Sequence, residues 1–155
     1  MLNQLNIYGK TKLDMAIERV KNFEPPDGYY LAFSGGKDSI AVKKVLDLAG
    51  VKYEAYYNVT TVDAPEQVKF IKEYHPDVIF SKPRWPDGRQ ITMWNLIPHK
   101  VAPPTRLRRY CCKYFKEGEG HNRFLVTGVR WAESTNRAKK RGVLKYQTIK
   151  KILEI

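Results

Sequence analysis

Residues 34–39 read Ser34-Gly35-Gly36-Lys37-Asp38-Ser39 and lie between two differently patterned segments. The preceding run, Tyr29–Phe33, is apolar like a buried strand, and the following segment, Ser39–Ala49, has apolar residues at helical spacing. A strand that turns through glycine into a helix exposes backbone N–H groups at the positive end of the helix dipole. Such an end binds anions, most often phosphate. The stretch therefore predicts a strand, a phosphate-binding loop and a helix.

The residue types in this loop suit that chemistry. The two glycines permit positive φ and let an anion approach the main chain without a Cβ in the way. Lys37 and the hydroxyls of Ser34 and Ser39 can reach phosphate oxygens, while Asp38 or Ser39 can cap the helix. The simpler alternative is an ordinary strand-to-helix turn with a capping aspartate. The G-x-x-x-x-G-K-[ST] spacing of a Walker A loop is absent, which argues against a GTPase or motor ATPase of that type.

Size and composition fit a single globular domain over residues 1–155. The chain has 155 residues, 43% hydrophobic and 12% aromatic, enough for a sizeable core. No apolar stretch approaches the length of a membrane span, and residues 1–12 lack the apolar region of a signal peptide. The two cysteines, Cys111 and Cys112, are adjacent and form no secreted disulfide framework. We therefore expect a cytoplasmic protein without a membrane partner.

The net charge of +12 is unevenly spread along the chain. Residues 1–81 hold 10 Lys/Arg and 11 Asp/Glu, whereas residues 82–155 hold 18 and 5. This asymmetry indicates a polyanionic partner for the second half, either a nucleotide with several phosphates or a nucleic acid. The alternative is a solvated basic face that serves solubility only.

Alternating strand and helix patterns predict the architecture. We expect helices over residues 10–23, 39–49, 65–74 and 106–117, and strands over 29–33, 51–59, 77–81, 123–129 and 143–155. Such alternation predicts an α/β fold with a doubly wound, mainly parallel five-stranded sheet and helices on both faces. Residues 82–105 break the rhythm with five prolines and one short helix near residues 91–96, and we interpret them as a functional insertion or arm.

Ligands of such sheets bind at the carboxyl ends of the strands. Three segments are expected to project from that edge: Ser34–Ser39, Asn58–Asp63 and Gly128–Arg137. In the last of these, Arg130 and Arg137 can hold a phosphate or sulfate through two bonds at once, and Glu133 can orient an arginine or accept from a ribose hydroxyl. The alternative for Glu133 is an ordinary surface ion pair.

Other residues are weaker candidates. Arg106, Arg108 and Arg109 form a further basic cluster for phosphate or sulfate, and Trp131 can stack on a base or simply pack in the core. The three histidines lack metal-ligand spacing, so no metal site is predicted from them. They are His75, His99 and His121.

Four ordered motifs resemble the phosphoadenosine phosphosulfate (PAPS) reductase family, within the adenine-nucleotide alpha-hydrolase-like superfamily. The Ser34–Ser39 loop resembles its pyrophosphate-binding PP-loop, and Asn58-Val59-Thr60-Thr61, followed by Pro65-Glu66, resembles the segment that approaches the adenosine. Arg109-Tyr110-Cys111-Cys112-Lys113 is similar to its double-cysteine segment. Gly128-Val129-Arg130-Trp131-Ala132-Glu133-Ser134, with Arg137 beyond, is similar to its G-x-R-x-x-E-S-x-x-R element.

The resemblance implies a nucleotide site and leaves the catalytic residues open. It implies that Ser34, Gly35, Gly36, Lys37, Asp38, Ser39, Asn58, Thr60, Thr61, Gly128, Arg130 and Arg137 bind an adenine nucleotide: ATP, adenylyl sulfate or PAPS. The candidates for catalysis are Lys37, Asp38, Arg130 and Glu133, and Mg²⁺ would neutralise the leaving group. Reductases of this family carry their nucleophilic cysteine in a C-terminal tail, and these 155 residues contain no third cysteine. Two cysteines also cannot complete a four-iron cluster.

Three functions follow as hypotheses. The first is a PAPS reductase-like enzyme of sulfur metabolism, either as a shortened or accessory member or with the missing part supplied by a protein partner or a second copy. The second is a PP-loop ATP pyrophosphatase that transfers AMP or sulfur, with a nucleic acid as one acceptor. The third is a nucleotide-binding subunit without turnover.

Overall fold

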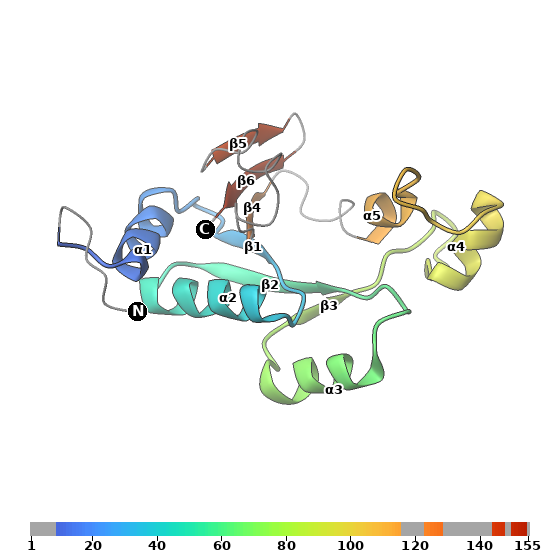
Figure 1. The fold of residues 1–155 in the computed structure, drawn as a ribbon, viewed down its shortest axis with the longest axis horizontal. Helices are drawn as coiled ribbons and strands as arrows, with labels where there is room; N and C mark the ends of the chain where they lie inside the picture. The colour runs from blue at the N-terminus through green and yellow to red at the C-terminus, as the bar shows by residue number, and fades with distance from the viewer. Residues whose placement is uncertain (1–8, 116–122, 129–143, 148–149, 155) are drawn as a thin grey trace.

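The computed structural model describes residues 9–115, 123–128, 144–147 and 150–154 (Figure 1). Three helix–strand alternations open the chain, two short helices follow, and three strands close it. The elements are α1 Lys12–Asn22, β1 Tyr29–Ala32, α2 Lys37–Ala49, β2 Tyr53–Asn58, α3 Pro65–Tyr74, β3 Ile79–Ser81, α4 Met93–Lys100, α5 Tyr110–Phe115, β4 Phe124–Thr127, β5 Leu144–Gln147 and β6 Lys150–Glu154.

The strands form one sheet in the order β3-β2-β1-β4-β6-β5. The four strands β3, β2, β1 and β4 are all parallel, β6 joins β4 in parallel, and β5 pairs antiparallel with β6. The α/β class and the mainly parallel sheet are confirmed. The count of five strands is wrong, because the described part of the chain contributes six. The segment predicted as one strand over residues 143–155 instead supplies the antiparallel pair β5 and β6.

The first strand of the chain, β1, lies in the interior of the sheet, and the strand order reverses there. From β1 the chain adds β2 and β3 on one side, then returns to add β4 on the other. In open parallel sheets a crevice forms outside the carboxyl ends of the strands where the strand order reverses, here between β1 and β4. The loop after β1 is Phe33–Gly36, so the predicted phosphate loop lies at this position.

One face of the sheet carries the main core. Alternate residues of β1 and β2, including Tyr29, Leu31 and Ala55, are buried in one cluster. The same cluster takes Val20 from α1, Leu46 from α2 and Ile71 from α3. Because alternate strand residues point to the same side, these three helices pack on a single face. A helical layer on the other face stays a prediction.

The opposite face of the sheet carries a polar aromatic cluster. The rings of Tyr30 and Tyr56 stack with centroids 4.4 Å apart, and the Arg123 guanidinium lies 6.0 Å from the Tyr30 centroid. Arg123 also pairs with Glu54, which accepts a 3.0 Å hydrogen bond from the Tyr56 hydroxyl. The Arg123 hydrogen bond is the main reason why the pKa of Glu54 lies below its ordinary value. These contacts link β1 and β2 to Arg123, the residue that precedes β4.

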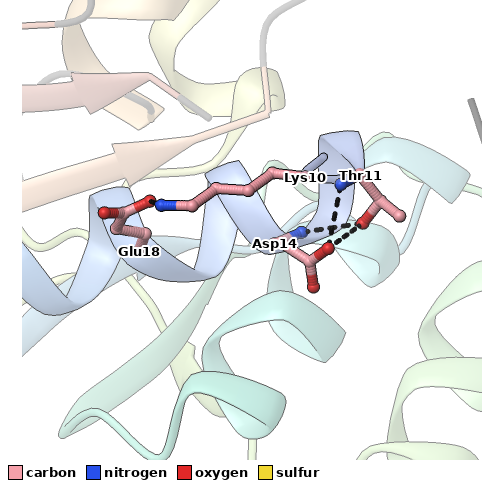
Figure 2. A network of polar contacts seen from close by, with 4 residues as sticks. All are labelled: Lys10, Thr11, Asp14 and Glu18. Carbon is pink, nitrogen blue, oxygen red and sulfur yellow. Dashed lines mark hydrogen bonds and ion pairs between the residues drawn. The ribbon is translucent and has the colours of Figure 1, made fainter. Parts of the chain in front are cut away.

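A local hydrogen-bonding pattern sets the start of α1. Thr11 caps the helix: its Oγ1 accepts from the Asp14 amide at 3.1 Å, while the Asp14 carboxylate accepts from the Thr11 amide at 2.9 Å (Figure 2). The hydrogen bonds from Thr11 lower the pKa of Asp14. Lys10 reaches over the first turns to pair with Glu18 at 2.5 Å. This reciprocal capping box explains why the helix begins at Lys12.

The bounds of α2 and α3 depend on glycine and proline. Pro65 occupies the first turn of α3, where its missing N–H costs nothing, as predicted. Gly50 ends α2 in the left-handed region at φ 67°, also as predicted. However, α2 begins at Lys37 rather than Ser39, because Gly36 is its N-cap with φ −80° and ψ 159°. The expectation that Asp38 or Ser39 caps the helix is therefore wrong.

The insertion predicted over residues 82–105 continues into α5, so the arm is defined from here on as residues 82–115, which have their own small core. Ile91, Leu96 and Phe115 are buried together, and Trp85, Met93, Tyr110, Cys111 and Tyr114 pack around them. Figure 1 shows α4 and α5 next to each other and away from β1 and β2. No described helix has the length and apolar character that crossing a membrane would require.

Both helices of the arm differ from expectation. A capping box between Thr92 and Asn95 starts α4 at Met93, and the helix continues through Pro98 to Lys100, beyond the predicted end at residue 96. The helix predicted over residues 106–117 begins only at Tyr110. Thr105 exchanges hydrogen bonds with the backbone of Arg108, which holds the preceding residues in a turn.

Candidate functional site

The loop between β1 and α2 has the geometry of an anion cradle. Gly35 takes φ +73°, a conformation that favours glycine, and a Cβ there would lie 2.8 Å from Ile71 Cδ1 of α3. Among the described residues, a Cβ at Gly36 would meet one side-chain atom, Ser34 Oγ, at 3.5 Å. No described side chain forms a capping hydrogen bond at this N-cap. The first turn of a helix carries amides without partners inside the helix, which is where an anion binds.

Short polar contacts hold the loop in this shape. Ser39 is buried, and its hydroxyl donates to the Gly36 carbonyl at 2.8 Å. The Ser34 hydroxyl donates to Ser39 Oγ at 3.2 Å, and Gln67 Nε2 of α3 donates to the Ser34 carbonyl at 2.6 Å. Lys37 is exposed at the mouth of the loop. The hydroxyls of Ser34 and Ser39, which were expected to reach phosphate, instead form hydrogen bonds within the loop in this structure.

A pocket of about 250 Å³ opens beside the loop at the carboxyl ends of β1 and β2. It brings together three residues that were predicted as ligand-binding from two separate segments, Ser34 with Asn58 and Thr60. The remaining lining residues are Ala32, Phe33, Tyr56, Tyr57, Asp63 and Gln67. Three larger hollows lie elsewhere on the described part of the protein, and none of them is lined by a residue of the loop.

Two residues that line the pocket each have a buried polar atom without a hydrogen-bond partner among the described residues: Asn58 Oδ1 and the Tyr57 hydroxyl. Tyr57 is only 3% exposed, and burial raises its pKa above the ordinary value. The Asp63 carboxylate raises it further, although the two groups do not meet in hydrogen-bonding geometry. An unpaired buried polar atom costs free energy. A ligand that pairs with these atoms would recover that cost.

The segment after β2 links the pocket to the arm. Asp63 accepts from the Thr60 hydroxyl at 2.7 Å and from the Thr60 amide at 3.2 Å. The next residue, Thr61, has φ 69°, an uncommon conformation for a β-branched side chain. Its hydroxyl accepts from the Met93 amide at the start of α4, at 3.0 Å. Thr61 was predicted to bind the nucleotide, but in the structure its hydroxyl is hydrogen-bonded to the arm.

The third predicted segment reaches the same edge through Gly128. A Cβ on Gly128 would lie 3.0 Å from the Asp38 carbonyl oxygen and 2.8 Å from Val42 Cγ2. The end of β4 therefore packs directly on the first turn of α2. Three other predicted site residues, Arg130, Glu133 and Arg137, lie outside the described residues, as does Trp131.

The basic cluster before α5 does not line the pocket. Arg106, Arg108 and Arg109 are exposed on the arm, and Arg109 Nη2 lies 3.5 Å from Cys112 Sγ. Cys111 and Cys112 are free thiols, and burial together with the Cys112 neighbour raises the pKa of Cys111. A raised pKa disfavours the thiolate that a nucleophilic cysteine needs. No group of three metal-ligating side chains is present in the described parts of the chain.

Sequence reasoning missed two residues of the site, Tyr57 and Gln67. Tyr57 was read only as part of a strand, since alternation directs it to the core. The available signal was its position next to Asn58 at a strand end. Gln67 lies in the first turn of α3, and nothing in its spacing indicates a bond to the Ser34 carbonyl 33 residues earlier.

The sequence was compared with known families and with curated proteins. No family model matches the chain, and no curated protein matches it.

Proposed function

We propose that the chain binds a nucleotide at the carboxyl edge of its sheet, with the phosphates on the N-terminus of α2 and the nucleoside in the adjoining pocket. One observation carries the proposal: a pocket lined by Ser34, Asn58 and Thr60 opens beside the β1–α2 loop, where no described side chain caps the start of α2. The uncapped amides suit an anion, and the pocket atoms suit a polar ring next to it.

The pocket favours a base that offers a hydrogen-bond donor. Asn58 Oδ1 is a buried acceptor in need of a donor, and an asparagine amide is complementary to the amino group and ring nitrogen of adenine. Asp63 lies in the same wall and can accept from a ribose hydroxyl. Lys37 stands exposed beside the loop, where its ammonium can approach phosphate oxygens. An adenine nucleotide is therefore the proposed ligand.

The resemblance to the PAPS reductase family extends this proposal. On that basis the fold is doubly wound and the protein is an enzyme that uses ATP, adenylyl sulfate or PAPS. Two reactions remain candidates, sulfonucleotide reduction and cleavage at the α-phosphate of ATP. In the second, the amides of the loop would stabilise negative charge that develops on the phosphates.

Titration calorimetry tests binding first. ATP, adenosine and inorganic pyrophosphate are titrated separately into the protein. We expect ATP to bind most tightly, because it alone occupies both the loop and the pocket. Binding of pyrophosphate as tight as that of ATP would exclude the pocket from the site.

A variant at the loop tests the location. Gly36→Val adds a side chain in front of the helix, at a backbone conformation that valine adopts readily. We expect ATP affinity to fall at least about tenfold, corresponding to the loss of one charge-assisted hydrogen bond. Ala41→Val is the control, since it adds the two methyl groups of valine on the exposed side of α2. Unchanged affinity in Gly36→Val would refute the assignment.

Identification of the reaction products distinguishes α-phosphate cleavage from sulfonucleotide reduction. The protein is incubated with ATP, adenylyl sulfate or PAPS together with a thiol reductant, and products are identified by mass spectrometry. Pyrophosphate indicates α-phosphate cleavage, and sulfite indicates reduction. Binding without either product indicates a nucleotide-binding subunit.

A further inference from the structure

The arm carries an unbalanced positive charge. Residues 82–115 contain eight lysines and arginines but one acidic residue, Asp87. That carboxylate is already paired, since it lies 2.7 Å from Arg89. The other seven cations of the arm therefore have no carboxylate within their own segment.

Three of these cations surround a groove of about 410 Å³ between the end of α4 and α5. They are Lys100, Arg108 and Lys113, and none of them forms an ion pair with a described residue. Ala102, Tyr110 and Tyr114 complete the lining. The described lining thus has three cations and no acidic residue, and a concave surface with such a charge balance attracts an anion.

The groove also presents two aromatic rings in fixed positions. The Tyr110 hydroxyl donates to the Ala102 carbonyl at 2.5 Å, and Tyr114 packs against Trp85 with ring centroids 5.8 Å apart. The Lys100 ammonium lies 5.2 Å from the Tyr114 centroid. These contacts hold both rings in place. The groove therefore combines cations with flat apolar surfaces, which suits phosphates with bases attached.

We propose that this groove binds the phosphodiester backbone of a nucleic acid. The positive charge continues outside the groove, where Arg106 and Arg109 are exposed on the same segment. A single small anion would use only part of that surface, whereas a polymer of phosphates uses all of it. The inference is independent of the nucleotide pocket, which lies at the carboxyl ends of β1 and β2.

Fluorescence anisotropy with labelled 20-nucleotide oligomers tests the proposal, using single-stranded RNA, single-stranded DNA and duplex DNA as separate probes. The full chain is titrated over a series of salt concentrations. We expect binding of at least one probe, with an affinity that falls as salt rises. The probe that binds most tightly identifies the source of the backbone. Absence of binding to all three at low salt would overturn the proposal.

Paired variants locate the site. Arg108→Ala combined with Lys113→Ala removes two exposed cations of the groove, and we expect an affinity about tenfold lower and a salt slope smaller by about 2. Lys12→Ala combined with Lys44→Ala removes the same charge from exposed positions of α1 and α2. Equal losses of affinity in the two double variants would show that only net charge matters and would overturn the assignment of binding to the groove.

Three further measurements make the result specific. Arg108→Lys combined with Lys113→Arg keeps both charges, so retained binding in this variant attributes the loss in the alanine variant to the missing charges. Gly36→Val must bind oligomers like the unaltered protein, which separates this site from the proposed nucleotide site. Vesicles containing anionic lipid serve as the last probe. Tighter binding to vesicles than to every oligomer would assign the arm to a membrane surface and overturn the proposal.

Discussion

Gly128, which follows β4, lies so close to Asp38 in the first turn of α2 that a Cβ on the glycine would be 3.0 Å from the aspartate carbonyl oxygen. The contact joins two segments that are 90 residues apart in the chain and brings the end of β4 to the loop after β1. A side chain at position 128 would separate them. The glycine is therefore required by packing at the edge where we place the ligand.

Gly128→Ala should destabilise the protein. The new methyl group would also lie 2.8 Å from Val42 Cγ2, so either α2 or β4 must shift. We expect the free energy of unfolding to fall by about 1–3 kcal/mol, measured by urea denaturation. Val42→Ala provides the control, because it removes one of the two obstructing groups. In a double-mutant cycle the two changes should cost less together than the sum of their separate costs.

Tyr57→Phe should not destabilise the protein, because the hydroxyl it removes is buried without a partner among the described residues. We expect the free energy of unfolding to stay equal or rise, by up to about 1 kcal/mol. Tyr53→Phe is the matched control on the same strand, where the hydroxyl donates to Asp47, and should cost about 1 kcal/mol. Nucleotide affinity should fall only in Tyr57→Phe. The opposite order of affinities would remove Tyr57 from the site.

The ion pair between Glu54 and Arg123 predicts a pH dependence. The pKa of Glu54 is lowered in the folded state, so its contribution to stability is present above the ordinary value of 4.5 and is lost as the pH falls through the folded-state pKa. Glu54→Gln should therefore be less stable than the unaltered protein at neutral pH, by under about 1 kcal/mol, because the pair is partly exposed. Denaturation at a series of pH values should show this difference shrinking in acid. A constant difference would contradict the assignment.

Leu96→Ala should loosen the arm while the sheet stays intact. Leu96 is fully buried, but its cluster with Ile91 and Phe115 is separate from the core of the sheet. We expect hydrogen exchange to accelerate across residues 91–115 and to remain slow in β1 and β2. Trp94→Ala is the control, since Trp94 is 70% exposed on the same helix. Faster exchange throughout the sheet would show that the two clusters unfold together.

The parts of the fold that sequence predicts well have strong local signals. Pro65 and Gly50 marked their helix ends, because each residue tolerates few other backbone positions. The start of α2 was missed by two residues, since an extended Gly36 can precede a helix without any capping side chain. The β5–β6 pair was read as one strand, because residues 144–154 contain no glycine or proline to indicate a turn.

The candidate site was harder to predict than the fold, because it depends on contacts between segments that are distant in the sequence. Its position at the carboxyl edge followed from the strand–helix alternation, which is why Ser34, Asn58 and Gly128 were expected near one another. The role of Thr61 could not be read from sequence, because its hydroxyl accepts from Met93, 32 residues later, and this contact depends on how the arm is placed. Arg130, Glu133 and Arg137 stay predictions.

The central place of β1 has a consequence for biosynthesis. Tyr30 pairs with Glu54 soon after both are made, but its other neighbour, Leu125, is synthesised 95 residues later. Until β4 leaves the ribosome, one edge of β1 presents unpaired backbone groups next to apolar side chains, and such an edge recruits other strands. Nascent chains or truncated products that stop within the arm should therefore aggregate, or need a chaperone, even though three strands of the sheet are already complete.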